Sequence, residues 1–160
     1  MQQIYDKATT CCFTGHRYIP ENQKKNVKKA LQNAIAEHIS KGVFTFISGG
    51  ALGFDTLAAE CVLKFRKEDR QVALVMMLPC RDQSAKWSAK DRAIYEEILK
   101  VADDIYFLND RYITGCMHQR NKMMVAQSGY CIAYFGGNSG GTAYTVGLAR
   151  EQGLCVKNIY

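Results

Sequence analysis

The 160-residue sequence has few prolines and no long hydrophobic run. It contains only two prolines, and 48% of its residues are hydrophobic against 22% charged, which is the balance of a folded chain rather than a disordered one. Its longest apolar stretch, residues 72–79, is far shorter than the roughly 20 residues of a membrane-spanning helix. We therefore expect one globular domain, residues 1–160, with a sizeable core and no membrane segment.

The sequence also lacks an export signal. Residues 1–7 carry no basic segment followed by an apolar run and a cleavage site, so we expect a cytoplasmic protein. The seven cysteines are odd in number and have no secretion signal beside them, which favours reduced thiols over disulfides. Cys11 and Cys12 should point to opposite faces of a strand. Cys116 and His118 lack a second ligand pair at metal-site spacing, so we expect no structural metal.

The formal net charge of +6 permits an anionic ligand or a nucleic acid. Much of the excess lies in four lysines spaced along one helix face: Lys24, Lys25, Lys28 and Lys29. No aromatic residues interleave with these lysines, which favours a solvated helix face over a nucleic-acid patch. We therefore expect a small anionic ligand as the partner rather than nucleic acid.

Short apolar runs alternate with helical patterns along the whole sequence. The runs predict strands at residues 9–13, 43–47, 72–78, 105–108 and 130–135, with 154–156 as a candidate sixth. Strands that are apolar on both faces and alternate with helices are typical of a parallel sheet covered by helices. The sequence therefore predicts the α/β class, as a Rossmann-like three-layer α/β/α sandwich with a mainly parallel sheet of five or six strands.

The intervening segments have apolar residues every three or four positions, as in helices with one buried face. Two such stripes are Val27, Leu31, Ile35 and His38, and Leu57, Ala58, Cys61, Val62 and Phe65. Ser88, with Asp91 three positions later, is a capping-box-like start for a third helix. Residues 114–126 and 142–151 complete the helices, and Gly153 ends the last one.

Three glycine-bearing loops follow predicted strands, at residues 14–17, 48–55 and 136–142. Ligands of parallel α/β sheets bind beyond the carboxyl ends of the strands, so these loops should share one edge of the sheet. Glycine lets the backbone approach a ligand closely, and a following helix offers free N–H groups to an anion. Neither the Gly-x-Gly-x-x-Gly nor the Walker A pattern is present, which disfavours dinucleotide dehydrogenases and P-loop NTPases. The loops therefore predict a phosphate-binding pocket of another kind.

These loops, together with Arg120-Asn121 before the fifth strand, resemble the YpsA family of the SLOG superfamily. The combination and order of the motifs carry the resemblance, which covers essentially the whole chain. It implies a bacterial-type, Rossmann-like protein that binds nucleotides or their derivatives. The superfamily also contains the DprA DNA-processing proteins and the LOG phosphoribohydrolases.

The resemblance implies a set of ligand-binding residues: Thr14, Gly15, His16, Arg17, Ser48, Gly49, Gly50, Gly53, Asp55, Arg120, Asn121, Gly140, Gly141 and Thr142. Arg17 and Arg120 are the natural charged partners, because a guanidinium can donate two parallel hydrogen bonds to a phosphate. Asp55 either accepts from ribose hydroxyls or simply caps a helix.

Other candidate roles follow from residue chemistry. His16 either hydrogen-bonds the ligand or the backbone, or acts as an acid or base. Asn121 is a candidate for reading a base or sugar edge, whereas Trp87 and Tyr144 either stack on a base or pack. His118 is expected to be structural. No catalytic residue, metal ligand or definite cofactor is assigned.

Three functions remain open. The first is regulatory binding or sensing of a nucleotide-derived ligand, such as an ADP-ribose-like, NAD-like or nucleoside phosphate molecule, without turnover. The second is LOG-like hydrolysis of nucleoside monophosphates, weakened because Thr145 replaces the functional glutamate, although Asp55 or Glu60 could supply a carboxylate. The third is DprA-like binding of single-stranded DNA, against which stand the short chain and the lack of a basic and aromatic groove. A homodimer is compatible with so small a domain.

Overall fold

The computed structural model describes residues 2–160 and contains every predicted strand and helix. The strands are β1 (Thr10–Gly15), β2 (Thr45–Ser48), β3 (Ala73–Leu78), β4 (Asp104–Phe107), β5 (Tyr130–Tyr134) and β6 (Cys155–Asn158). The α-helices are α1 (Lys24–Ser40), α2 (Phe54–Glu68), α3 (Ala89–Val101), α4 (Cys116–Ala126) and α5 (Gly141–Glu151). Short 3₁₀ turns, η1 (Lys7–Thr9) and η2 (Glu21–Gln23), precede β1 and α1.

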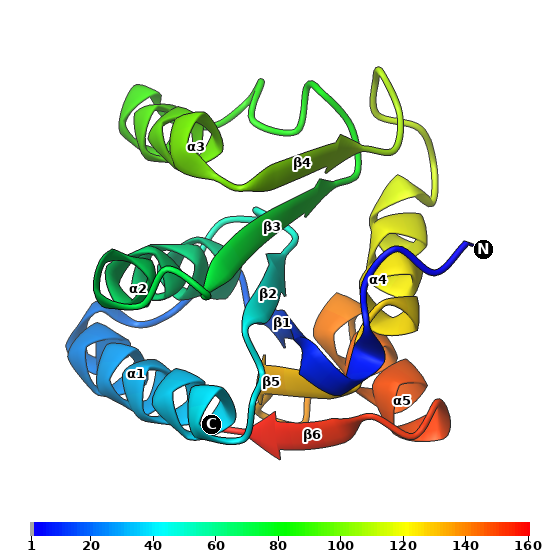
Figure 1. Cartoon of the computed structure of the whole chain (residues 1–160). Helices are drawn as coiled ribbons and strands as arrows, with labels where there is room; N and C mark the ends of the chain where they lie inside the picture. The colour runs from blue at the N-terminus through cyan, green and yellow to red at the C-terminus, as the bar shows by residue number, and fades with distance from the viewer. Residues whose placement is uncertain (1) are drawn as a thin grey trace.

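All six strands run parallel in one sheet of order β4-β3-β2-β1-β5-β6, which confirms the predicted Rossmann-like class. Helices α1, α2 and α3 cover one face of the sheet, and α4 and α5 cover the other (Figure 1). The chain steps outward from β1 to β4 and then crosses to β5 on the other side of β1. The carboxyl ends of the neighbouring strands β1 and β5 therefore form the topological switch point, where ligands of such sheets bind.

The sheet separates two hydrophobic cores. Cys11 belongs to the core under α1, α2 and α3, whereas Cys12 belongs to the core under α4 and α5, as their alternation along a strand predicts. All seven cysteines are free thiols, and only Cys155 among them is exposed. Burial on both faces explains why β1, β2, β3 and β5 are apolar runs.

The expectation that every strand is apolar on both faces is wrong for β4 and β6. Strand β4 is exposed at Asp104 and Ile105, and only Val156 of β6 is even partly buried. Both strands lie at the edges of the sheet, where helices cover them less completely. Edge position therefore allows the polar residues that the apolar-run pattern did not anticipate.

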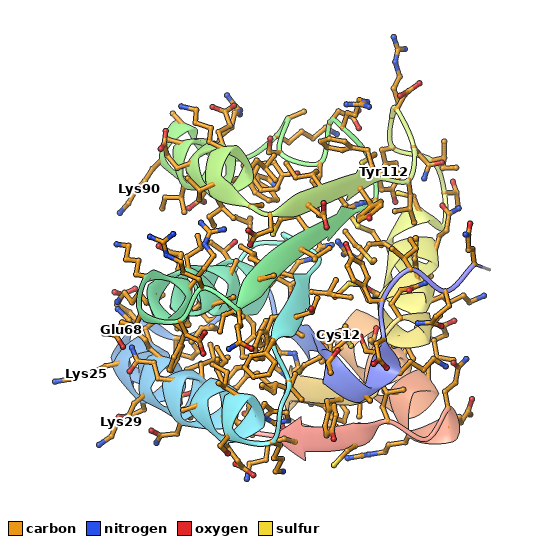
Figure 2. The ribbon with its side chains drawn as sticks, in the orientation of Figure 1. Cys12, Lys25, Lys29, Glu68, Lys90 and Tyr112 are labelled. Atoms are coloured by element: carbon orange, nitrogen blue, oxygen red, sulfur yellow. The ribbon has the colours of Figure 1, made fainter. Side chains whose placement is uncertain are left out.

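The helix ends and surfaces largely follow the sequence. The Ser88 hydroxyl accepts a hydrogen bond from the Asp91 N–H at 3.1 Å and so caps α3. Gly153 follows α5 with a φ of 80°, a left-handed conformation that favours glycine. Lys25 and Lys29 project from α1 away from the sheet (Figure 2), as expected for a solvated face. No helix within residues 2–160 combines the length and the apolar character that crossing a membrane requires.

Candidate functional site

The loops after β1, β2 and β5 meet at the carboxyl edge of the sheet, beside the switch point. A cavity of about 290 Å³ lies there. It is lined by Phe13, Thr14, Gly15, His16, Arg17, Ala51, Asp55, Met117, His118, Arg120, Asn121, Ser139, Gly141 and Thr142. Parallel strands bring these segments together because all their carboxyl ends point the same way.

Nine of the fourteen predicted ligand-binding residues line this cavity: Thr14, Gly15, His16, Arg17, Asp55, Arg120, Asn121, Gly141 and Thr142. The other five, Ser48, Gly49, Gly50, Gly53 and Gly140, are not among the residues that line it. Their glycine spacing predicted the loops correctly but not which residues face the cavity. Direct ligand contact by any of the fourteen stays a prediction.

Three of the residues outside the lining, Ser48, Gly49 and Gly50, shape the loop after β2. The Ser48 hydroxyl donates to the Asp55 carbonyl oxygen at 3.0 Å and accepts from the Gly50 N–H at 3.2 Å. A Cβ on Gly49 would lie 2.6 Å from the Arg120 guanidinium, so only glycine lets that side chain pass. Ser48 and Gly49 therefore shape the cavity from behind rather than from its wall.

Five lining residues were not predicted: Phe13, Ala51, Met117, His118 and Ser139. His118, expected to be structural, lines the cavity and packs edge-on against Tyr144, with ring centroids 4.5 Å apart. Because Asn121 is three positions after His118 on α4, helical spacing from the predicted Arg120-Asn121 pair could have identified it. Trp87 instead packs on Tyr95, with ring centroids 5.0 Å apart, and is absent from the lining.

Arg120 is the buried cation of the site, with only 3% of its surface exposed. One terminal nitrogen donates to the Gly49 carbonyl oxygen, and Nε donates to Asn121 Oδ1 at 2.8 Å. Burial lowers the pKa of this guanidinium, and the nearby Asp55 carboxylate opposes that effect. An arginine remains charged in either case, so the cavity keeps a positive wall whose orientation is set by Gly49 and Asn121.

Asp55 is the carboxylate of the site and is 7% exposed. Its Oδ2 accepts a hydrogen bond from the Ala51 N–H at 3.3 Å. The hypothesis that it caps α2 is wrong, because the N-cap residue is Gly53 and Asp55 lies inside the first turn. Burial raises the pKa of Asp55 to about 6, against the opposing effects of Arg120, the Ala51 N–H and Arg17.

The raised pKa of Asp55 predicts a pH-dependent loss of stability. The folded protein holds this proton up to about pH 6, whereas an ordinary aspartate releases it near 3.8. The difference corresponds to about 3 kcal/mol of unfolding free energy, present below pH 4 and lost as the pH rises to about 6. Asp55→Asn should remove that loss and be more stable than the wild type at pH 7.

Urea unfolding of both proteins at several values between pH 4 and pH 7 measures this effect. The difference between wild type and variant cancels the titration of the other acids, including Glu21 and Glu37, whose pKa values are lowered by lysines. Parallel stability curves would show that Asp55 titrates normally in the folded state.

His16 hydrogen-bonds the backbone, one of the roles predicted for it. Its Nε2 accepts from the Gly136 N–H at 2.9 Å, which joins the loop after β1 to the loop after β5. The rings of Tyr134 and Tyr160 lie edge-on to the imidazole, with centroids 5.7 Å and 6.1 Å away. Because Nε2 accepts here, the neutral ring carries its proton on Nδ1. His16 thus connects the two loops that flank the switch point.

The amino end of α5 is the part of the cavity best suited to an anion. Its N-cap residue, Gly140, provides no side-chain cap, so the first N–H groups of the helix have no side-chain acceptor from that position. A Cβ built on Gly141 would meet no atom within 4 Å, so the space in front of this helix end is open. An open helix start combined with Arg17 and Arg120 provides both hydrogen-bond donors and positive charge for a phosphate.

Within residues 2–160, no three histidine, cysteine, aspartate or glutamate side chains gather closely enough to hold a metal ion. The cavity donors are instead backbone N–H groups and guanidinium groups, which bind anions.

Fold and site together define a Rossmann-like α/β protein with a cationic cavity at the switch point of its sheet. A family model described as the YspA SLOG family, named YpsA, matches residues 12–153. The chain belongs to this family. The match includes all three glycine-bearing loops and Arg120-Asn121, the segments that build the cavity.

The chain is also similar to other proteins over most of its length. The chain is 30% identical over 141 residues to the uncharacterized SPbeta prophage-derived protein YoqJ of Bacillus subtilis, covering 80% of this chain and 82% of YoqJ. It is also similar to DprA from Streptococcus pneumoniae, with a TM-score of 0.66 and 16% identity over 94% of this chain. DprA from Helicobacter pylori, described for its single-stranded DNA binding mode, matches with a TM-score of 0.66 and 19% identity, again over 94% of this chain.

The DprA proteins are longer than this chain. The match spans 50% of the Streptococcus pneumoniae protein and 64% of the Helicobacter pylori protein. At these identities the likeness shows a shared fold, namely the parallel sheet and its covering helices. A shared fold does not determine the ligand, which depends on the residues that line the cavity.

Proposed function

We propose that this protein binds the phosphate group of a nucleotide or nucleotide-derived ligand in the cavity beyond the carboxyl ends of β1 and β5, and acts by recognition rather than turnover. The observation that carries the proposal is the open amino end of α5, which faces the same cavity as Arg17 and Arg120. Free backbone donors, a favourable helix dipole and guanidinium groups together suit a phosphate.

The two arginines have different parts in this proposal. Arg120 is buried and already donates to Gly49 and Asn121, so it supplies a fixed positive wall. Arg17 is exposed, and within residues 2–160 no acceptor forms a hydrogen bond or ion pair with its guanidinium. Arg17 is therefore free to donate to a bound phosphate.

The residues in and around the cavity give little support to hydrolysis of the LOG type. Thr145, which stands at the position of the LOG glutamate, is 1% exposed, and its hydroxyl donates to the Gly141 carbonyl oxygen at 2.9 Å. Glu60 lines grooves beside α2 and is absent from the lining of this cavity. Asp55 is the only carboxylate in the lining, so the carboxylate chemistry of a glycosidase would depend on it alone.

Isothermal titration calorimetry with inorganic phosphate, AMP, ADP-ribose and NAD tests the proposal, with chromatography of each mixture for released base. Arg17→Ala should weaken binding of the best ligand about 10- to 100-fold, because it removes a charge-assisted hydrogen bond. Arg150→Ala is the matched control, since Arg150 is an exposed arginine of α5 that does not line the cavity.

Each outcome of this experiment separates the candidate functions. Binding without base release, weakened by Arg17→Ala but not by Arg150→Ala, supports recognition. Release of free base would establish a hydrolase. A further titration with a single-stranded oligonucleotide tests the third function. Tight binding with a steep salt dependence, and no response to the small ligands, would favour a DprA-like function instead.

A further inference from the structure

We propose that the groove between α2 and α3 is an interface at which two copies of this chain form a dimer with two-fold symmetry. The groove has a volume of about 590 Å³ and runs between two neighbouring helices that cover the same face of the sheet (Figure 1). It shares no lining residue with the cavity at the switch point. The proposal is therefore independent of the ligand that binds in that cavity.

The centre of the groove is apolar and open to solvent. Leu63 of α2 and three residues of α3 line it: Ile94, Ile98 and Val101. Val101 is 47% exposed, and Leu63 and Ile94 are half-buried, so part of their apolar surface faces water. An exposed apolar surface that is rimmed by charged residues is typical of a site that binds another protein. The groove therefore offers an apolar centre for an interface.

Arg66 holds the two sides of the groove together. Its Nη1 donates to the Val101 carbonyl oxygen at 2.7 Å and to Asp103 Oδ2 at 2.8 Å. These bonds join α2 to the carboxyl end of α3 and to the turn that follows it. A surface that already has its bound shape loses less entropy on association.

The two sides of the groove differ in charge. Three basic residues and one acidic residue line it on the α2 side: Lys64, Arg66, Lys67 and Glu60. On the α3 side, Glu97 is the only charged lining residue among residues 2–160. The α2 side is therefore positive and the α3 side is negative.

Lys64 lacks a carboxylate partner in the described chain. Within residues 2–160, no carboxylate oxygen lies within 4.0 Å of its ammonium nitrogen. The like charge of Lys28, on α1, lies beside Lys64 and lowers its pKa. Glu97 pairs with Lys100 at 2.9 Å, but both side chains are 70% exposed, and such a pair contributes little. Lys64 and Glu97 are therefore available to a partner.

Two-fold symmetry brings these opposite charges together. Helices α2 and α3 each connect consecutive strands of one parallel sheet, so they run in the same direction. A two-fold axis along the groove places α2 of one copy against α3 of the other and preserves that direction. Lys64 and Glu97 both lie near the middle of the groove, so Lys64 of each copy meets Glu97 of the other. The groove is thus complementary to itself, which identifies a second copy of the chain as its occupant.

Sedimentation velocity over a wide range of protein concentrations tests the proposal. The wild type should shift from monomer to dimer as the concentration rises. Val101→Asp should raise the dissociation constant of the dimer at least about 100-fold, because each copy would bury an unpaired charge at the apolar centre. Ile113→Asp is the matched control, since Ile113 is 51% exposed and does not line the groove. Thermal unfolding checks that both variants are folded.

Exchanging the two charges distinguishes this dimer from any other. Lys64→Glu alone and Glu97→Lys alone should each weaken self-association at least about tenfold, because like charges then face each other twice in every dimer. A mixture of the two variants should form a heterodimer with about the wild-type affinity, because each contact again joins a lysine to a glutamate. A change confined to one chain could not be rescued by mixing.

A wild type that stays monomeric at every concentration would overturn the proposal and leave the groove to another occupant. A dimer that Val101→Asp leaves intact would do the same, because it would use another surface. If the mixture of charge variants fails to associate, the pairing of Lys64 with Glu97 is wrong. None of these results affects the proposed phosphate binding, which depends on Arg17 and the amino end of α5.

Discussion

Gly141→Glu is expected to abolish binding of phosphate-bearing ligands, with an affinity loss of at least about 100-fold. Gly141 begins α5 and lines the cavity, and a side chain added there would enter open space rather than protein. A glutamate would therefore extend into the proposed phosphate position without disturbing the fold. Its carboxylate would occupy the free N–H groups and repel the ligand, which costs several kcal/mol. Calorimetry with the best ligand measures the loss.

Gly147→Glu provides the matched control for that variant. Gly147 lies on the same helix and is exposed, and a Cβ added there would meet no atom within 4 Å, but it does not line the cavity. The substitution adds the same charge, and in both variants a stronger helix former replaces a glycine of α5. Equal weakening by both variants would point to a general charge effect and remove the helix start from the proposal.

Gly53→Ala is expected to destabilise the protein by about 3–5 kcal/mol, as a backbone strain and a steric clash act together. Gly53 has a φ of 78°, which residues with a Cβ rarely adopt. Its Cβ would also overlap the Arg17 carbonyl oxygen, which belongs to the loop after β1. A hydrogen bond also joins the loops after β1 and β2, because the Phe54 N–H donates to the His16 carbonyl oxygen at 3.1 Å. Urea unfolding measures the change.

Gly153→Ala separates the two causes. Gly153 has nearly the same φ, 80°, yet a Cβ there would meet no atom within 4 Å. This variant should therefore cost only about 1 kcal/mol, from the backbone conformation alone. If Gly53→Ala costs no more than Gly153→Ala, the loops after β1 and β2 separate readily and do not form a rigid wall of the site.

The elements of the fold could be predicted because each one depends on a local pattern. Central strands are buried on both faces, so they appear as apolar runs, and helices with one covered face show the stripe that begins at Val27. The predicted strand ends differ from the observed ones by at most two residues, and the candidate sixth strand at residues 154–156 corresponds to β6, Cys155–Asn158. The edge strands departed from the pattern because the position of a strand in the sheet, central or at the edge, cannot be determined from the residues of that strand alone.

The loops of the candidate site could be predicted from the sequence, but not which of their residues line the cavity. Parallel strands with glycine loops at their carboxyl ends specify that the loops meet, so the sequence by itself determined the α/β class and the shared edge at which the loops of Arg17 and Asp55 lie. Arg120 was added by the family resemblance, and the strand order that defines the switch point came from the structure. Tertiary structure alone decided that Gly49 and Gly50 lie behind the cavity and that His118 faces it. The physical reason is that glycine spacing specifies where a backbone turns, whereas the direction in which a residue faces depends on packing between segments far apart in the chain.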